Sequence, residues 1–504
     1  MNLFEYMKDA EDFISKVEKE YYLHFAGLKP NLNLKSIYDG YESLFTHESL
    51  NSLKNLSEKI KKENKGNIDE EKRALYLFQF CLEGYLSNKF QNIADKIANI
   101  EAITKINIDG KDVPFRYSDI LLLNEEDTNK RRLIEDKRRE TISRVFNPDL
   151  KIYWESLHEE SLRLGYKSYL DLFMYVKGID IYKLDKEMDM LLEATTELYE
   201  YHIGKLFKEK LGIDVYNSRA SDFAFVKRAK EFDVYFKKEN MIPVFKESMR
   251  LLNIDIDKQD NIIMDTEERE TKSPRAFCCT VKVPSEIYLV ILPGGGQDDY
   301  VSLFHEGGHA EHFANTMSNL DFPFRYLGDS SLTEGYAFCF ESFASNKNWL
   351  KDILNMNNQA VEDFTYFLGL INLFFLRRYA GKLKYEILLH SEKKVDNKDE
   401  LYSEILSENL IVKYFPEDYL RDVDEGFYCV NYIRAWIFEA QLRNYMLNKF
   451  GYTWYKNKKA SDLLKELWSY GQKYSPEEVL NFLDYKNLDI NFLIDNTIEV
   501  LNKR

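Results

Sequence analysis

Apolar residues recur every three to four positions along most of this chain, which is the spacing of amphipathic helices. Proline and glycine, which would interrupt such helices, number only 10 and 21 in 504 residues. We therefore expect a mainly α-helical protein. Residues 106–113 predict a short hairpin with an Asp-Gly turn, and residues 276–281 and 287–292 are rich in strand formers.

One helix is predicted over residues 299–316, where apolar residues again follow this spacing. Asp298 and Asp299 precede the pattern and are candidate N-cap residues. Gly307 and Gly308 interrupt it, at a cost of about 1 kcal/mol each in a helix interior. Two glycines in a helix predict that another backbone, or a bound substrate, comes close to this face.

The same helix carries His305, Glu306 and His309. Residues four apart project from one helical face, so the two imidazoles can bind one tetrahedral zinc ion. Glu306 lies beside them, where a carboxylate can take a proton from a water bound to the metal. His312, three residues further on, lies on a neighbouring face; we expect it to support a ligand or simply to pack, and metal binding is the less favoured alternative.

A third ligand is expected from a second helix, over residues 332–342, which is rich in aromatic residues and therefore buried. Its two carboxylates, Glu334 and Glu341, need partners because a bare buried charge is costly. Glu334 is the candidate third ligand. Glu341 lies two turns further along the same face, where it either orients a ligand histidine or forms a salt bridge.

The order of these motifs resembles the gluzincin metallopeptidases. The spacing is most similar to the thimet oligopeptidase and oligoendopeptidase F family, to which the angiotensin-converting enzyme and Taq carboxypeptidase families are related. The resemblance covers residues 270–445. It implies two mainly helical lobes flanking a deep substrate cleft, a small β-sheet next to the zinc-binding helix, one Zn²⁺ per chain, and short peptides as substrates.

The resemblance also implies a role in peptide binding for the β-rich run before the motif helix. In this family, the edge strand at that place binds the peptide by main-chain pairing, which gives affinity for many sequences. The corresponding residues here are Ala276, Phe277 and Cys278. A purely structural hairpin is the alternative for each of them.

Residues 426–436 resemble the tyrosine-rich helix of the oligopeptidases, whose tyrosines donate hydrogen bonds to the developing oxyanion. Asn431 and Arg434 stand where those enzymes carry tyrosine, which leaves the donor open between Tyr432 and Tyr428. Arg434 is a candidate for binding a peptide carboxylate, with a structural ion pair as the alternative.

The composition of the chain disfavours some classes of partner and location. The net charge of −16 disfavours a nucleic-acid partner, because a phosphate backbone attracts basic surfaces. We expect no membrane span, since no segment has about 18 consecutive apolar residues. The five cysteines do not form a disulfide pattern and the N-terminus does not look like a signal peptide, so a cytoplasmic location is expected. A helical lobe over residues 1–150 would precede a catalytic region over 151–504.

Three functions are compatible with these motifs. The first is a zinc metallopeptidase that hydrolyses short peptides, with Glu306 as general base and acid. The second is a zinc carboxypeptidase or peptidyl-dipeptidase with the same metal site, and the third is a metal-binding protein without turnover. The sequence decides neither the peptide preference nor the oligomeric state.

Overall fold

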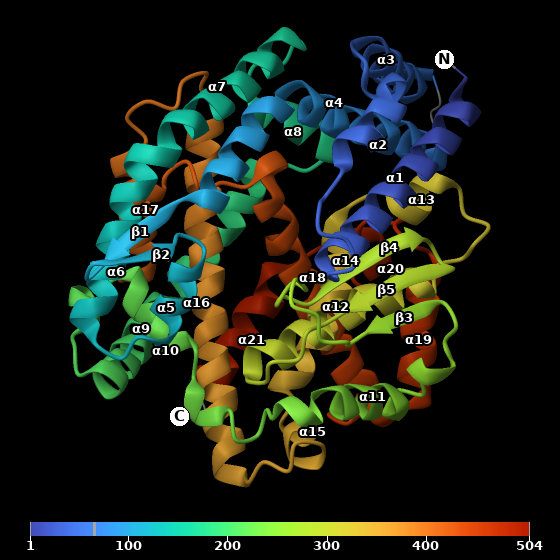
Figure 1. The fold of residues 1–504 in the computed structure, drawn as a ribbon. Coiled ribbons are helices and arrows are strands. Elements are labelled where there is room, and N and C mark those ends of the chain that lie inside the picture. The colour runs from blue at the N-terminus through green and yellow to red at the C-terminus, as the bar shows by residue number, and fades with distance from the viewer. Residues whose placement is uncertain (1, 64–66, 503–504) are drawn as a thin grey trace. The chain divides into compact units, whose positions relative to one another are not determined.

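The computed structural model describes residues 2–63 and 67–502, and it is mainly α-helical with two small sheets, as expected (Figure 1). The chain divides into two compact units, each built from three separate segments. The first comprises Met1–Asn88, Lys230–Thr365 and Asn431–Leu493. The second comprises Lys89–Ala229, Tyr366–Val430 and Ile494–Arg504. Residue 150, where we expected a boundary, lies inside helix α7 (Asn147–Arg163) of the second unit.

The first unit contains the central sheet and these helices: α1 (Leu3–Phe25), α2 (Leu34–Gly40), α3 (His47–Glu63), α11 (Met241–Leu251), α12 (Gln297–Ala314), α13 (Phe322–Tyr326), α14 (Ser330–Glu341), α15 (Lys347–Asp352), α19 (Lys458–Ser469) and α20 (Pro476–Asn481). The second contains α5 (Tyr117–Asn124), α6 (Thr128–Thr141), α7 (Asn147–Arg163), α8 (Tyr169–Lys177), α9 (Ile181–Leu211), α10 (Ala220–Lys227) and α17 (Asp399–Leu410). Four further helices have residues in both: α4 (Ile68–Ile103), α16 (Asn358–His390), α18 (Tyr428–Phe450) and α21 (Ile490–Asn502).

The predicted hairpin of the second unit is present. Strands β1 (Lys105–Ile108) and β2 (Lys111–Pro114) pair antiparallel. Asp109 and Gly110 connect them with φ values of 49° and 80°. Both values are positive, as the two central residues of a type I′ turn require, and this explains why the Asp-Gly pair was a reliable signal.

The sheet of the first unit has the strand order β3-β5-β4, with bounds Ile262–Asp265, Glu286–Val290 and Phe277–Lys282. Strand β3 runs parallel to β5, and β4 runs antiparallel to it. Both predicted runs upstream of the motif helix are therefore strands. Within the described residues, β4 pairs with β5 alone, so its other side is an edge of this sheet.

Helices α1 and α12 both pack against this sheet. The ring of Tyr22 on α1 stacks on Tyr288 of β5 at a centroid distance of 3.7 Å, in a cluster that includes Cys279 and Val281 of β4. Side chains alternate between the faces of a strand, so the neighbours of Tyr288 on β5 point to the opposite face. We therefore assign α1 to one face of the sheet and α12 to the other.

A further expectation from the sequence concerned membrane spans. Within the described residues, no helix combines the length and the apolar character that crossing a bilayer requires.

Candidate metal centre

The motif helix, α12, begins two residues earlier than predicted, and its N-cap is Gly296. The prediction of an N-cap at Asp298 or Asp299 was therefore wrong, because both lie inside the first turn. Asp299 instead accepts hydrogen bonds from the amides of residues 294 and 295, at 2.7 and 2.9 Å. It thus folds the glycine loop back onto the start of the helix, where negative charge is favourable.

The two glycines of α12 allow close packing. A Cβ at Gly308 would lie 2.7 Å from the Cα of Ala337 and 3.0 Å from the carbonyl oxygen of Tyr336, both on α14. A Cβ at Gly307 would lie 2.6 Å from the ring of Phe245. Of the two alternatives drawn from the sequence, the approach of another backbone therefore explains Gly308, and that approach brings α14 alongside the histidines.

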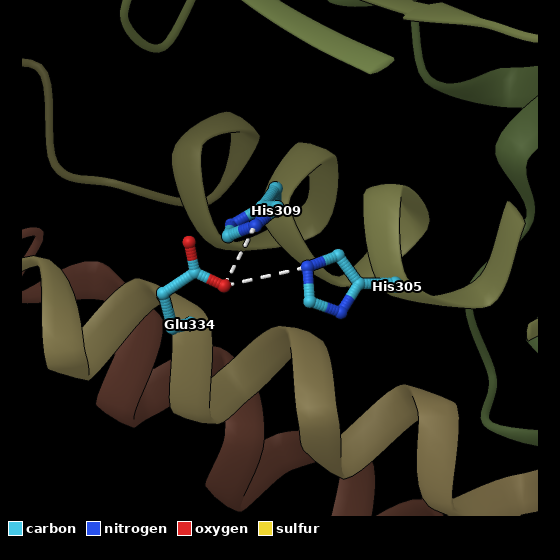
Figure 2. A group of neighbouring side chains, drawn as sticks. All are labelled: His305, His309 and Glu334. Atoms are coloured by element: carbon cyan, nitrogen blue, oxygen red, sulfur yellow. Dashed lines mark ion pairs between the residues drawn. The ribbon is translucent and has the colours of Figure 1, made fainter. Parts of the chain in front are cut away.

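His305, His309 and Glu334 come together across the two helices (Figure 2). The Nε2 atom of His305 lies 3.3 Å from Oε2 of Glu334, and the Nε2 atom of His309 lies 3.7 Å from the same oxygen. All three side chains are largely shielded from solvent, with exposed fractions of 17%, 13% and 7%. Three potential ligand atoms thus face one small space.

The other ring nitrogen of each histidine has a different partner. His305 Nδ1 donates to Oε2 of Glu341 at 3.2 Å, and His309 Nδ1 lies 2.8 Å from the hydroxyl of Thr333. Such contacts fix the ring orientation and leave Nε2 free to bind a metal. The contact of Glu341 with a motif histidine corresponds to one of the two alternatives that the sequence left open. The contact of Thr333 was not predicted, although the residue directly precedes Glu334.

The electrostatics of the group attract positive charge. Burial acts to lower the pKa of His305, but hydrogen bonds and charges from Glu334 and Glu341 outweigh it and raise this pKa to about 10. For His309, burial dominates and lowers the pKa to about 4. Burial, together with the charge of Glu334, raises the pKa of Glu306 to about 7. The carboxylates of Glu334 and Glu341 thus favour a positive charge on His305.

Glu306 lies between the histidines in sequence but points to the sheet. Its carboxylate accepts a hydrogen bond from the backbone amide of Cys278 on edge strand β4. Of the predicted peptide-binding residues, Phe277 and Cys278 begin this strand, and Ala276 directly precedes it. The candidate base and the candidate peptide-binding strand are therefore in direct contact.

Two other predicted residues have partners elsewhere in the first unit. His312 is fully buried, and its Nε2 donates to the carbonyl of Gly471 at 3.1 Å. The guanidinium of Arg434 donates to Glu477 at 2.5 and 3.0 Å and to Asp329 at 2.6 Å. This is the structural ion pair that the sequence left open for Arg434.

The two tyrosine candidates differ in how they are placed. The ring of Tyr432 lies 6.1 Å from that of Phe338, which in turn lies 5.2 Å from the ring of His305. One aromatic ring, that of Phe338, thus lies between Tyr432 and the candidate metal ligand His305. Tyr428 is the first residue of α18 and belongs to the second unit. Both remain candidates for the oxyanion donor.

The donor set of the first group fits a catalytic zinc ion. Two imidazole nitrogens and one carboxylate oxygen would hold such an ion and leave one coordination position for water. A second group of possible ligands in the described residues, Glu386, Asp424 and Cys429, has a different character. There the ammonium of Lys382 lies 2.8 Å from Asp424 and 3.8 Å from Glu386, so a side chain of the protein already supplies the positive charge that these carboxylates need.

Comparisons with models of protein families and with curated proteins find no match for this chain. The functional argument therefore depends on the site itself.

Proposed function

We propose that this protein is a zinc-dependent metallopeptidase that hydrolyses short peptides. One observation carries the proposal: both Nε2 atoms of His305 and His309 converge on Glu334, while Glu341 and Thr333 hold the opposite nitrogens. Two-sided support of this kind is typical of histidines that bind a metal. Glu306 on the same helix supplies the base that such a site needs.

In this proposal His305, His309 and Glu334 hold one Zn²⁺. When bound, zinc polarises the scissile carbonyl and lowers the pKa of a coordinated water. Glu306 takes a proton from the water and delivers it to the leaving amine, so it acts as both base and acid. Tyr432 or Tyr428 donates a hydrogen bond to the oxyanion.

The peptide binds as an added strand along the outer side of β4, next to Glu306. Main-chain pairing there is tolerant of sequence, which suits a peptidase for varied short peptides. The resemblance to the thimet oligopeptidase and oligoendopeptidase F family supports this part of the proposal. It further implies two helical lobes around a deep cleft, which would exclude folded proteins.

The carboxypeptidase and peptidyl-dipeptidase alternatives require a group that binds the carboxylate of the peptide. Arg434 was the candidate, but Asp329 and Glu477 already hold its guanidinium. We therefore favour cleavage at internal bonds. Peptides with an amidated C-terminus should be cleaved as well as those with a free carboxylate, and a requirement for the free carboxylate would reverse this preference.

The decisive experiment uses a mixed library of short peptides, with mass spectrometry of the products. We expect new internal cleavage sites that disappear with a zinc chelator and return when zinc is added. The absence of cleavage across the library, in protein that contains zinc, would refute the peptidase function and favour a metal-binding protein without turnover.

The substitution Glu306→Gln tests the assigned base. It should keep the zinc and reduce turnover by about 10²- to 10⁴-fold, the usual range for a positioned acid-base group. Glu311→Gln is the matched control on the same helix. The carboxylate of Glu311 accepts from Gln259 and Asn315, each at 3.0 Å, and takes no part in the metal group. Full turnover by Glu306→Gln would eliminate the assigned base.

A further inference from the structure

Two glutamates, one from each helix that packs on the sheet, reach the outer side of strand β4. Glu306 of α12 accepts from the amide of Cys278. Glu18 of α1 accepts from the amide of Thr280 at 2.9 Å. Cys278 and Thr280 are two residues apart, so their amides point to the same side of the strand. These two outward amides are thus held by carboxylates, which the carbonyl groups of a peptide pairing with β4 would displace.

This spacing places Glu18 within the proposed substrate path. Two residues of a strand span about 7 Å, so a peptide lying along β4 would pass both glutamates. If its scissile bond lies at Glu306, the group nearest Glu18 belongs to a residue one or two positions away. Glu18 is therefore close enough to select substrates and too far from Glu306 to share its role.

Glu18 is an unusual carboxylate. Burial raises its pKa, and only the single amide bond from Thr280 opposes this. In the described part of the chain, Glu18 forms no ion pair. Lys19, the next residue along α1, pairs with Glu286 at 2.8 Å instead.

A partly desolvated carboxylate without a cation gains free energy when a cation arrives. At the edge of β4, the incoming group is the substrate. We propose that Glu18 selects peptides that carry a cationic nitrogen one or two residues from the scissile bond. This inference depends on the proposed peptidase function. The nitrogen belongs either to a lysine or arginine side chain or to a free amino terminus, and both would bind through the same charge-assisted hydrogen bond.

The test uses a peptide that the wild-type protein cleaves, in two matched series. One series carries lysine or acetyl-lysine at each of the two positions on either side of the cleaved bond. The other has a free or an acetylated amino terminus at the same distances. We expect a higher kcat/KM for the charged member in one series, mainly through KM. The series in which it occurs identifies the source of the nitrogen.

Glu18→Gln should reduce this charge preference by roughly 10- to 100-fold, the range expected when a hydrogen bond between charged groups is lost. The glutamine keeps an oxygen for the amide of Thr280, so a purely structural role would leave the preference unchanged. Glu5→Gln is the control, because Glu5 is an exposed residue of the same helix. It should retain the wild-type preference.

The outcomes separate this inference from the function on which it depends. If the wild-type protein cleaves no peptide, both fail. If it cleaves peptides but shows no charge preference in either series, or if Glu18→Gln retains the preference, only the role of Glu18 is refuted.

Discussion

The part of the chain that the structure describes contains two close pairs of histidines, and their surroundings differ completely. In the first unit, the rings of His305 and His309 lie 4.9 Å apart with an interplanar angle of 81°. In the second unit, the rings of His158 and His390 lie 5.1 Å apart at 88°. The distance and angle between the rings are nearly the same, so these values do not reveal which pair has a chemical role.

The direction of the ring nitrogens separates the two pairs. His305 and His309 turn their Nε2 atoms towards Glu334. His158 and His390 bond to each other, with 2.8 Å between Nε2 and Nδ1, and His158 Nδ1 donates to the carbonyl of Lys393. A metal ion needs unprotonated nitrogens that converge, whereas a hydrogen-bonded pair uses its nitrogens internally. Only in the pair of the first unit do the nitrogens converge, and a bound metal ion would replace the proton on His305.

The largest expected effect is on zinc binding, which should depend on one histidine pair and not on the other. His309→Ala removes one of three ligands, so bound zinc should fall from about one ion per chain to close to none. His158→Gln, in the other pair, should retain the full complement. Metal analysis of the two purified variants measures this directly. Equal zinc content in both would mean that the ion binds elsewhere.

A smaller effect is expected from the contacts behind the ligands. Thr333→Val removes the hydroxyl near His309 Nδ1 with little change in volume, and it should weaken zinc binding by about 10- to 100-fold. Thr333→Ser keeps the hydroxyl and is the matched control. Competition with a chromogenic chelator measures both affinities. If the valine variant binds zinc as tightly as the serine variant, the hydroxyl does not orient His309.

Local patterns predicted the parts of the site that lie on single helices. The spacing of His305 and His309 fixes their common face, and the cost of burying Glu334 in an aromatic helix pointed to a cation. Strands β4 and β5 and the hairpin with its Asp-Gly turn were also accessible, because their signals lie within a few residues, whereas β3 was not predicted. These features depend on neighbours along the chain.

The remaining features depend on contacts between distant segments. Thr333 meets His309 only because Gly308 lets α12 and α14 approach, and Glu18 meets Thr280 across 262 positions. The pairing of His158 with His390 spans 232 positions. Polar residues on amphipathic helices are too common for their partners to be read from the sequence. Arg434 illustrates this, since only the fold shows that Asp329 and Glu477 hold it.

The smallest expected effect is on the pH dependence of stability, to which the histidine pair of the second unit contributes. Burial lowers the pKa of His158 from 6.5 to about 4, and it lowers that of His390 as well. Just below pH 6.5, both histidines are therefore neutral in the folded protein, whereas the same two side chains bind protons in the unfolded chain. Their contribution to stability is complete above pH 6.5 and is lost as the pH falls towards 4. One pH unit below 6.5, His158 alone accounts for about 1 kcal/mol.

The variant His158→Gln isolates this contribution. Glutamine can donate to the carbonyl of Lys393 and accept from His390, but it does not titrate. The urea midpoint of the wild-type protein, followed by circular dichroism, should fall more between about pH 7.5 and pH 5.5 than that of the variant. Other groups contribute equally to both proteins, so the difference between the two shifts reports His158. Equal shifts would mean that this buried pair does not resist protonation, and the contrast with His305 and His309 would then be one of geometry alone.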